Sequence, residues 1–192
     1  MSEKTKRPFI LVGNHLAMDF INTLFRCHGE DVDLLSSIDD FGLWAEEMSI
    51  ELDADNREKN LEAVRALRSA LKTLMLAQLD QEVLPETAVE IVNKHLYHAP
   101  TQQKFLLVEQ EVALQPLFPK LSVEQVLGKI AREAAELLTS DQRQHIKSCS
   151  NEKCVLLFVD TSRAKKRRWC CMERCGNRAK AANFYHANKA SD

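Results

Sequence analysis

Four of the six cysteines in this 192-residue sequence form two pairs near its C-terminal end. Four residues separate Cys149 from Cys154, another four separate Cys170 from Cys175, and fifteen lie between the pairs. Thiolates are soft ligands, and zinc accepts four of them in a closed tetrahedral site. The spacing therefore predicts a structural Zn²⁺ site whose ligands are these four cysteines.

Other uses of the cysteines remain open. Cys171 can replace Cys170 as a ligand, which shortens the second spacer to three residues. If it stays free, neighbouring positive charge favours its oxidisable thiolate. A redox pair, or four cysteines with no shared role, would also account for the residues. Cys27 stands alone, and we interpret it as a half-buried thiol.

The residues around the pairs indicate how the ligands are positioned. The apolar run Val155–Val159 predicts a strand, Asp160–Ser162 favours a turn, and Ala164–Trp169 predicts a basic returning strand. A helix is expected from Cys175 to about Asn188. Two knuckles, a hairpin and a terminal helix make a treble-clef-like finger. So short a segment has little core, so its folding is expected to depend on zinc.

Basic side chains are concentrated in this finger. Residues 147–192 contain 11 Lys and Arg against 4 Asp and Glu, a balance of +7, whereas residues 1–146 have a balance of −9. Phosphate neutralisation is the simplest use of such a surface, so we expect a nucleic acid, DNA in particular, as partner. The candidate contact residues are Arg163, Lys165, Lys166, Arg167, Arg168, Arg174, Arg178 and Lys180. The alternative is a surface that promotes solubility or docks on the acidic remainder of the chain.

A second polar cluster is predicted near the N-terminus. His15, Asp19 and Asn22 follow helical spacing and share one face, and Arg65 and Arg68 lie on a long helix that can pack opposite. These side chains can line a pocket for a small polar or anionic effector. We favour instead an internal network in which Asp19 pairs with an arginine. His15 and Asp19 alone are weak evidence for a metal site.

Most of the remaining sequence is helical in pattern. Helices are expected over His15–Phe25, after the N-cap Ser37, over Asp55–Gln81, from Pro85 as first helical residue, behind the Ser122–Gln125 capping box, and over Asp141–Lys147. Strands are expected at Phe9–Val12 and within Phe105–Leu114, and a polar loop is expected at Arg26–Asp33. His95 and His98 are interpreted as ordinary helix-end residues.

Composition and hydropathy indicate the class of protein to expect. Hydrophobic residues make up 45% of the sequence, which supports a packed core, and no long apolar run predicts a signal peptide or membrane helix. We expect a cytoplasmic α+β protein, mainly α. A helical domain with a few short strands would span residues 1–146, and the finger would span 147–192. A homodimer is a further expectation, although no heptad pattern supports it.

The finger residues carry a resemblance to a known family. Phe158–Arg163, Arg167–Cys170, Met172 and Cys175–Arg178 with Lys180 resemble the CGNR-type zinc finger of bacterial regulators. The resemblance implies that Cys149, Cys154, Cys170 and Cys175 bind zinc. Two positions depart from the family pattern. Ala164 stands where Asn is usual, and Cys171 stands where a small polar residue such as Ser is usual.

The preceding residues are similar to the ABATE domain that usually comes before this finger. The similarity is carried by His15–Thr23, by the start of the helix at Leu35–Trp44, and by Arg65–Arg68. Together the two parts cover nearly the whole chain. The resemblance implies a DNA-binding protein with a role in stress-responsive transcription, and it allows a sensor role for the helical domain.

Two classes of function therefore compete, and a third is disfavoured. The first is a DNA-binding transcriptional regulator, and the second is a zinc-stabilised adaptor that binds protein or RNA. An enzyme is not expected, because the sequence has no Gly-rich phosphate loop and no nucleophile elbow, and a four-thiolate zinc site has no open position. The sequence names neither an operator nor an effector.

Overall fold

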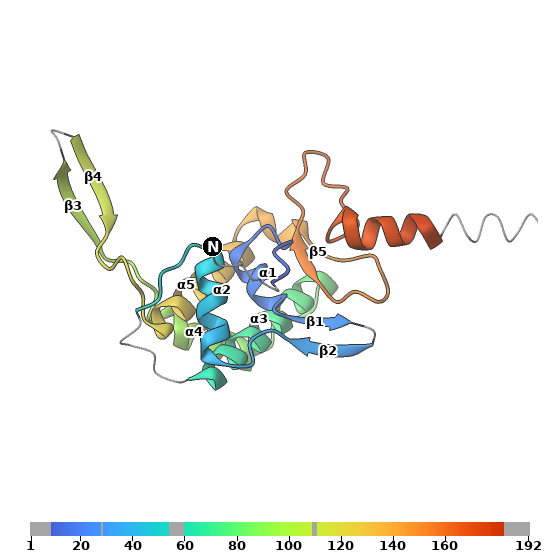
Figure 1. Cartoon of the computed structure of the whole chain (residues 1–192), viewed down its shortest axis with the longest axis horizontal. Coiled ribbons are helices and arrows are strands. Elements are labelled where there is room, and N and C mark those ends of the chain that lie inside the picture. The colour runs from blue at the N-terminus through green and yellow to red at the C-terminus, as the bar shows by residue number, and fades with distance from the viewer. Residues whose placement is uncertain (1–8, 28, 54–59, 109–110, 183–192) are drawn as a thin grey trace, which may run out of the picture. The chain divides into compact units, whose positions relative to one another are not determined.

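A computed structural model describes residues 9–27, 29–53, 60–108 and 111–182 of the chain. The chain forms two compact units: Leu35–Thr139, and Met1–Leu34 together with Ser140–Asp192. Helices dominate, and the strands occur in short antiparallel pairs (Figure 1). The mainly helical α+β class is thus confirmed. The first 34 residues belong to the unit that holds the finger, and the boundary after residue 146 stays a prediction.

Helix α2 (Ile38–Glu47) of the unit 35–139 begins with the predicted cap. The hydroxyl of Ser37 accepts a hydrogen bond from the N–H of Asp40 at 3.1 Å, and the Asp40 carboxylate accepts one from the N–H of Ser37 at 2.9 Å. This reciprocal capping box satisfies two donors that the first helical turn leaves unpaired. The helix buries Phe41 and Trp44, whose rings stack 5.8 Å apart.

Three longer helices complete the core of this unit. Helices α3 (Leu61–Asp80), α4 (Glu86–Leu96) and α5 (Val123–Thr139) pack against one another. Apolar residues at helical spacing face inward and are buried. They include Val64, Leu67, Leu71, Met75, Val92, Val126, Leu127 and Ile130. Pro85, expected as the first helical residue, is instead the N-cap of α4.

The strands described in this unit form one hairpin. β3 (Gln103–Val108) and β4 (Glu111–Pro116) pair in antiparallel fashion, as predicted for Phe105–Leu114. The hairpin extends away from the helices of its own unit (Figure 1).

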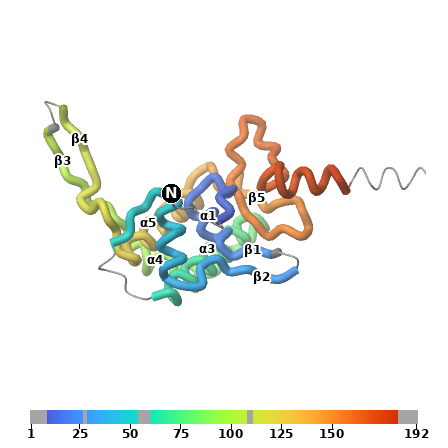
Figure 2. The backbone as a smooth tube through the Cα atoms, viewed as in Figure 1, coloured from blue at the N-terminus to red at the C-terminus, as the bar shows by residue number. Residues whose placement is uncertain are grey.

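The other unit brings together the two ends of the chain. Its elements are α1 (Leu16–Ile21), β1 (Leu24–Cys27), β2 (Glu30–Asp33), η2 (Asp141–His145), β5 (Ile146–Ser148), β6 (Leu157–Val159) and η3 (Met172–Gly176). β1 pairs with β2 and β5 with β6, both antiparallel, and α1 packs against β6. Figure 2 shows the chain path, in which the blue N-terminal segment lies beside the orange and red finger. The finger is therefore built on residues that precede the helical unit.

The N-terminal segment differs from its predicted secondary structure. Phe9–Val12 is not a strand, because its backbone does not pair with a neighbouring strand among the described residues. The predicted helix His15–Phe25 ends at Ile21, since Asn22 and Thr23 turn their side chains to other backbone groups. The predicted polar loop Arg26–Asp33 instead contributes to the β1–β2 hairpin, whose turn contains Gly29 at φ 93°, a conformation that glycine adopts without strain.

The finger also differs in its second half. Ala164–Trp169 forms turns and irregular backbone rather than a basic strand, because side chains hydrogen-bond the polar groups that a ladder would use. The terminal helix begins earlier than predicted, with the wide turn η3, and continues as α-helix over residues 177–182. Its expected continuation to Asn188, and residues 55–59 of the predicted Asp55–Gln81 helix, lie outside the described residues.

Helices of the described residues are either too short or too polar to span a membrane.

Candidate metal centre and basic surface

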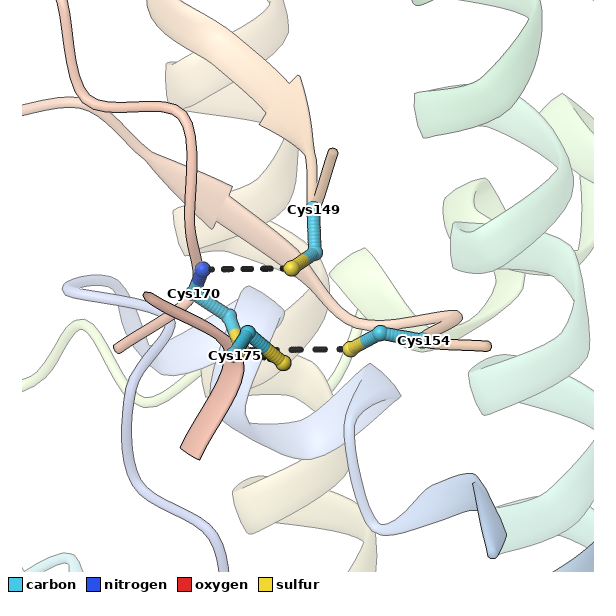
Figure 3. A group of neighbouring side chains, drawn as sticks. All are labelled: Cys149, Cys154, Cys170 and Cys175. Atoms are coloured by element: carbon cyan, nitrogen blue, oxygen red, sulfur yellow. Dashed lines mark hydrogen bonds between the residues drawn. The ribbon is translucent and has the colours of Figure 1, made fainter. Parts of the chain in front are cut away.

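The four predicted ligands meet at one point in the finger (Figure 3). The sulfur atoms of Cys149, Cys154, Cys170 and Cys175 all lie within 4.8 Å of one another. Cys154 Sγ is 3.8 Å from Cys170 Sγ, which is 3.6 Å from Cys175 Sγ. Ligands about 2.3 Å from a tetrahedral ion lie about 3.8 Å apart, so the four sulfurs fit a single metal ion. Cys171 is not part of this group.

The thiols of the cluster differ in acidity. The hydrogen bond between Cys170 and Cys154 lowers the pKa of Cys154 to about 5 and raises the pKa of Cys170. Burial raises the pKa of Cys175 to about 12. The cluster by itself therefore favours a thiolate at Cys154 over thiolates at Cys170 and Cys175. A cation at its centre favours ionisation of the others, so metal binding releases protons.

Backbone hydrogen bonds shape the first knuckle. It connects β5 to β6, whose pairing brings its two ends together. The N–H of Cys149 donates to the carbonyl of Leu156 at 3.1 Å, and the N–H of Cys154 donates to Asn151 at 2.8 Å. The second bond closes a tight turn between the two cysteines. Both sulfurs of this pair are thus positioned by the backbone.

The second knuckle is bonded to the first. The N–H of Cys170 points at the sulfur of Cys149 at 3.4 Å, and the carbonyl of Arg168 accepts a hydrogen bond from Ser150 at 2.9 Å. The start of η3 is closed by a bond from the N–H of Gly176 to Cys171 at 3.1 Å. These bonds hold the two cysteine pairs in register with each other.

A small apolar core surrounds the sulfurs. Ile10, Leu156 and Phe158 are buried together with Cys149, Cys170 and Cys175, and Val12 and Trp169 pack at the edge. Ile10 comes from the N-terminal segment, so the finger does not supply its core alone. The sequence did not reveal this contribution, because a single apolar residue at that distance along the chain carries no signal of its partners.

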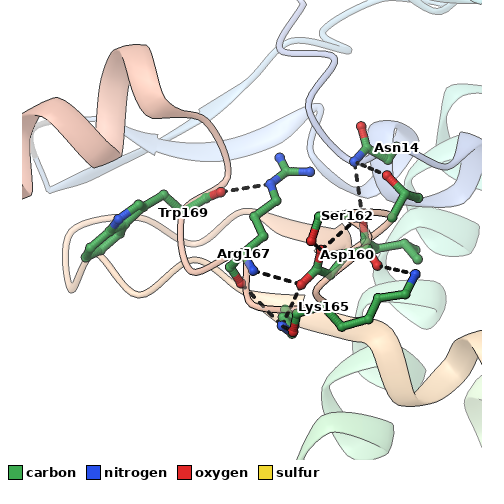
Figure 4. A network of polar contacts seen from close by, with 9 residues as sticks. Asn14, Asp160, Ser162, Lys165, Arg167 and Trp169 are labelled. Carbon is green, nitrogen blue, oxygen red and sulfur yellow. Dashed lines mark hydrogen bonds and ion pairs between the residues drawn. The ribbon is translucent and has the colours of Figure 1, made fainter.

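Asp160 organises the loop that follows β6 (Figure 4). Its carboxylate is fully buried and accepts hydrogen bonds from Lys147 Nζ at 2.7 Å, from the N–H of Arg167 at 2.9 Å, and from the Ser162 hydroxyl at 2.6 Å. Burial opposes its ionisation, but these donors outweigh burial and hold the pKa of Asp160 well below its usual range. Asp160 is therefore a charged anchor for the basic loop.

The guanidinium of Arg167 lies in the finger rather than in solvent. Its Nε donates to the carbonyl of Trp169 at 2.9 Å, and its Nη2 donates to the carbonyls of Val12 at 2.9 Å and of Cys170. The group also lies over the ring of Phe158, 4.2 Å from its centre. Arg167 thus joins the N-terminal segment to the second knuckle.

The predicted basic contacts divide into two groups. Lys165 donates from Nζ to the carbonyl of Asp160 at 2.9 Å and has a left-handed backbone with φ 52°, so it shapes the loop together with Arg167. The remaining six side chains are exposed: Arg163, Lys166, Arg168, Arg174, Arg178 and Lys180. Within the described part of the chain none of the six is in an ion pair.

Asn22 and Asp19, predicted for an effector pocket, bind backbone groups of the finger unit. Nδ2 of Asn22 donates to the carbonyl of Leu157 at 2.8 Å, and Oδ1 accepts from the N–H of Leu157 at 3.0 Å. Oδ1 of Asp19 accepts from the N–H of Gly13 at 2.8 Å. Burial raises the pKa of Asp19 to about 6, although the N–H groups of Gly13 and Val12 and the charge of Arg167 oppose the increase.

The other predicted pocket residues lie in both units. Nδ1 of His15 caps α1 by accepting the N–H of Ala17 at 3.2 Å. Arg65 and Arg68 are on α3 in the unit 35–139, where Nη2 of Arg65 donates to the carbonyl of Leu35 at 3.0 Å and Arg68 is buried. The effector pocket stays a prediction.

Two further residues connect the N-terminal segment to the finger. Gly13 accepts the N–H of Val159 at 2.8 Å, and Nδ2 of Asn14 donates to Thr161 Oγ1 at 3.1 Å. A Cβ on Gly13 would lie 2.9 Å from the backbone nitrogen of Asp19, so the close approach requires glycine. Sequence reasoning missed both residues. The sequence feature that could have identified them is the Gly13–Asn14 dipeptide directly before the His15–Thr23 motif.

The fold and the cysteine cluster define a class of protein that combines a finger with a metal-ion site and a separate helical unit, residues 35–139. The comparisons agree with this class. Residues 14–141 match the ABATE family, described as "Putative stress-induced transcription regulator", and residues 145–187 match the CGNR zinc finger. The chain belongs to the ABATE family, and the predicted resemblance is confirmed. Neither is a family of enzymes. The search of curated proteins returns no match.

Proposed function

We propose that this protein is a zinc-dependent, DNA-binding transcriptional regulator. Zinc is the ion that suits four thiolates in a tetrahedral, closed site, and the sulfur positions in the cluster fit its bond lengths. The ion holds the two knuckles together and has no open position for a substrate. Its role is therefore structural rather than catalytic.

The distribution of the basic side chains carries the proposal. The six exposed cations lie on the loop anchored by Asp160, on the second knuckle, and on the terminal helix. Arg174 and Arg178 are four residues apart and share one face where the backbone is helical. Because Lys147, Lys165 and Arg167 use their donors to hold the loop, the six others are left to meet phosphates.

Binding of the zinc-loaded 192-residue chain to a mixed-sequence DNA duplex tests the proposal. Fluorescence anisotropy across a range of salt concentrations gives the slope of log affinity against log salt. Six phosphate contacts predict a slope of about −5. A slope near zero, or no binding at low salt, would contradict the proposal.

A matched pair of triple variants identifies the surface. Changing Lys166, Arg168 and Arg174 to Gln removes three charges from the finger, and the slope is expected to become shallower by about 3. The control changes the same number of charges in the unit 35–139 and should leave the slope unchanged. It carries Gln at Lys94, Lys120 and Lys129.

A zinc-stabilised adaptor for RNA or protein is the competing function. Single-stranded RNA that competes better than duplex DNA at equal salt would favour it. A cytoplasmic location is part of the same proposal, because a transcriptional regulator acts in the compartment that holds the chromosome. Recognition of a small polar effector by the helical unit remains a separate prediction.

A further inference from the structure

The helical unit 35–139 contains a cleft of about 750 Å³ between the C-terminal half of α4 and the first turns of α3 and α5. Sites for small molecules usually have volumes of about 300 to 1,000 Å³. None of the residues of the cleft belongs to the effector pocket predicted from the sequence. Its apolar wall consists of Ala63, Ala66, Ile91, Val123 and Leu127.

Close packing of α5 against the end of α4 shapes one side of the cleft. Gly128 on α5 is buried, and a Cβ at this position would lie 2.5 Å from the backbone nitrogen of Ala99. Only glycine allows so close an approach. His98 lies in the turn that follows α4, and its N–H donates to the carbonyl of His95 at 2.9 Å. The contact with α5 thus holds both histidines at the wall of the cleft.

His95 is buried in this wall without a hydrogen-bond partner. It is only 7% exposed, and its imidazole makes no hydrogen bond to any residue that the structure describes. A buried polar group that has given up water normally has a replacement partner in the protein. His95 was interpreted from the sequence as an ordinary helix-end residue, but its burial distinguishes it from the exposed His98. A ligand in the cleft would supply the missing partner.

The uncompensated charge of the cleft is positive. Neither Lys94 nor Lys120 forms an ion pair within the described ranges of the chain. Asp53 and Glu124 also line the cleft, but Asp53 already has an interaction of its own, and Glu124 accepts a hydrogen bond from the Ser122 hydroxyl at 3.1 Å. Glu124 also lies in the first turn of α5, where the helix dipole stabilises its charge. The two lysines therefore favour a ligand with negative charge.

We propose that this cleft binds a small organic anion, in which an acidic group is joined to an apolar body. The acidic group takes the ring of His95 as its buried partner and the ammonium groups of Lys94 and Lys120 as its counter-charges. The apolar body lies against the wall that Ile91 and Leu127 contribute to. The inference does not rest on the proposed function, because ligand binding is measured without DNA.

The protonation of His95 agrees with an anion site. Burial lowers the pKa of His95, the charges of Lys94 and His98 lower it further, and the charge of Glu124 opposes the decrease. The other charged side chains at the cleft are Lys120 and Asp53. The ring of the free protein is therefore mainly neutral at pH 7. An anion beside it favours the protonated ring, so binding takes up a proton and becomes tighter as pH falls.

Titration of the zinc-loaded 192-residue chain with benzoate, benzamide and benzamidine tests the proposal. These three compounds have the same ring and nearly the same size, but they are anionic, neutral and cationic. NMR of the histidine ring nitrogens reports binding at His95. Benzoate has few atoms, so a dissociation constant of about 1 mM is expected, with benzamide at least about 10-fold weaker and benzamidine weaker still. Absence of benzoate binding, or equal or tighter binding of either other compound, would overturn the proposal.

Single lysine variants test the charge. Lys94→Gln and Lys120→Gln should each weaken benzoate binding about 3- to 10-fold and leave benzamide binding unchanged, because only the charged contact is lost. Lys104→Gln is the matched control, since Lys104 is exposed on β3 outside the cleft, and it should change neither affinity. Lysine variants at the cleft that bind benzoate as tightly as the control does would contradict the proposal.

His95→Phe tests the buried partner, because it keeps an aromatic ring and removes both nitrogens. A folded His95→Phe protein, checked by circular dichroism, should bind benzoate at least about 10-fold more weakly, and unchanged affinity would overturn the proposal. The pH dependence of the wild type decides the matter even if this variant does not fold. Benzoate affinity should rise at least about 3-fold from pH 8 to pH 6 in the wild type and in His98→Gln. Affinity that is flat over this range would contradict the role of His95.

Discussion

The side-chain amide of Asn22 hydrogen-bonds both backbone groups of Leu157, at 2.8 Å to the carbonyl and 3.0 Å from the N–H. It completes the edge of β6 as a neighbouring strand would. Asn22→Ala leaves a buried donor and a buried acceptor without partners. We expect the free energy of unfolding of the finger unit to fall by about 2 to 4 kcal/mol. Urea unfolding of the zinc-loaded protein measures this change.

Asn93→Ala is the control for this prediction. Asn93 is exposed on α4, so its replacement should change stability by less than about 0.5 kcal/mol. If Asn22→Ala were as mild as Asn93→Ala, the amide would not hold the N-terminal segment to the finger.

The buried ion pair between Lys147 and Asp160 should be strongly coupled. Asp160→Asn removes the charge that Lys147 pairs with at 2.7 Å and weakens the anchor of the basic loop. A double-mutant cycle with Lys147→Met should give a coupling energy of about 1 to 3 kcal/mol in the free energy of unfolding. Asp160→Asn should also weaken DNA binding, since the loop that carries Arg163 and Lys166 loses its anchor.

The exposed pair of Arg132 and Glu136 on α5 is the comparison. It has a similar length, 2.8 Å, but its side chains are 49% and 59% exposed. Solvent screening should limit its coupling to about 0.5 kcal/mol or less. Equal coupling energies in the two cycles would contradict the anchoring role of Asp160.

Asp19 should make the finger unit less stable as pH rises. Its pKa is raised from the ordinary value of 3.8 to about 6 in the folded state, so the folded state binds more protons than the unfolded state between these values. Its contribution to stability is full below pH 4 and is lost as pH rises through about 6. Relative to wild type, Asp19→Asn should therefore gain up to about 3 kcal/mol between pH 4 and 7.

The quantity to measure is the difference in the free energy of unfolding between wild type and Asp19→Asn, because metal affinity also changes with pH in both proteins. Unfolding of wild type and Asp19→Asn at matched pH and free zinc gives that difference. A difference that is flat from pH 4 to 7 would show that Asp19 does not titrate in this range.

Removal of the metal should unfold the two units to different extents. The chain has two tryptophans, and Trp169 lies beside the cysteines whereas Trp44 is buried in the core of the unit 35–139. A strong chelator should shift the emission of Trp169 to longer wavelength and leave that of Trp44 nearly unchanged. Single-tryptophan variants, Trp44→Phe and Trp169→Phe, separate the two signals.

Restoration of Zn²⁺ should reverse the Trp169 signal. Metal content should be one ion per chain in the wild type and should fall sharply in Cys154→Ser. An equal loss of both tryptophan signals on chelation would contradict the separate stability of the helical unit.

The sequence predicted the parts of this protein whose signals are local. The capping residues Ser37 and Ser122 were identified because their partners, Asp40 and Gln125, lie three positions away. The cysteine cluster was predicted because ligand spacing reports directly on tetrahedral geometry. The apolar residues of α3 follow the helical period over twenty residues, and a helix was therefore predicted there.

Two of the failures arise where a side chain hydrogen-bonds a backbone group that regular secondary structure would otherwise use. Ala164–Trp169 was predicted as the strand that returns after the turn at Asp160–Ser162, but Asp160 and the guanidinium of Arg167 hydrogen-bond its backbone groups. The helix starting at His15 was predicted four residues too long because Asn22 binds Leu157, which lies 135 positions away. Propensity describes a residue's neighbours in sequence, and these contacts override it.

Because Ile10 and Cys175 belong to the same small core, the finger can close only after the ribosome has released both of these residues and the helical unit between them. The helical unit, whose contacts are confined to the middle of the chain, is free to fold first. The loop anchored by Asp160 belongs to the same unit as Ile10 and Cys175. The order of that loop thus depends on contacts between two segments that the helical unit separates in the sequence.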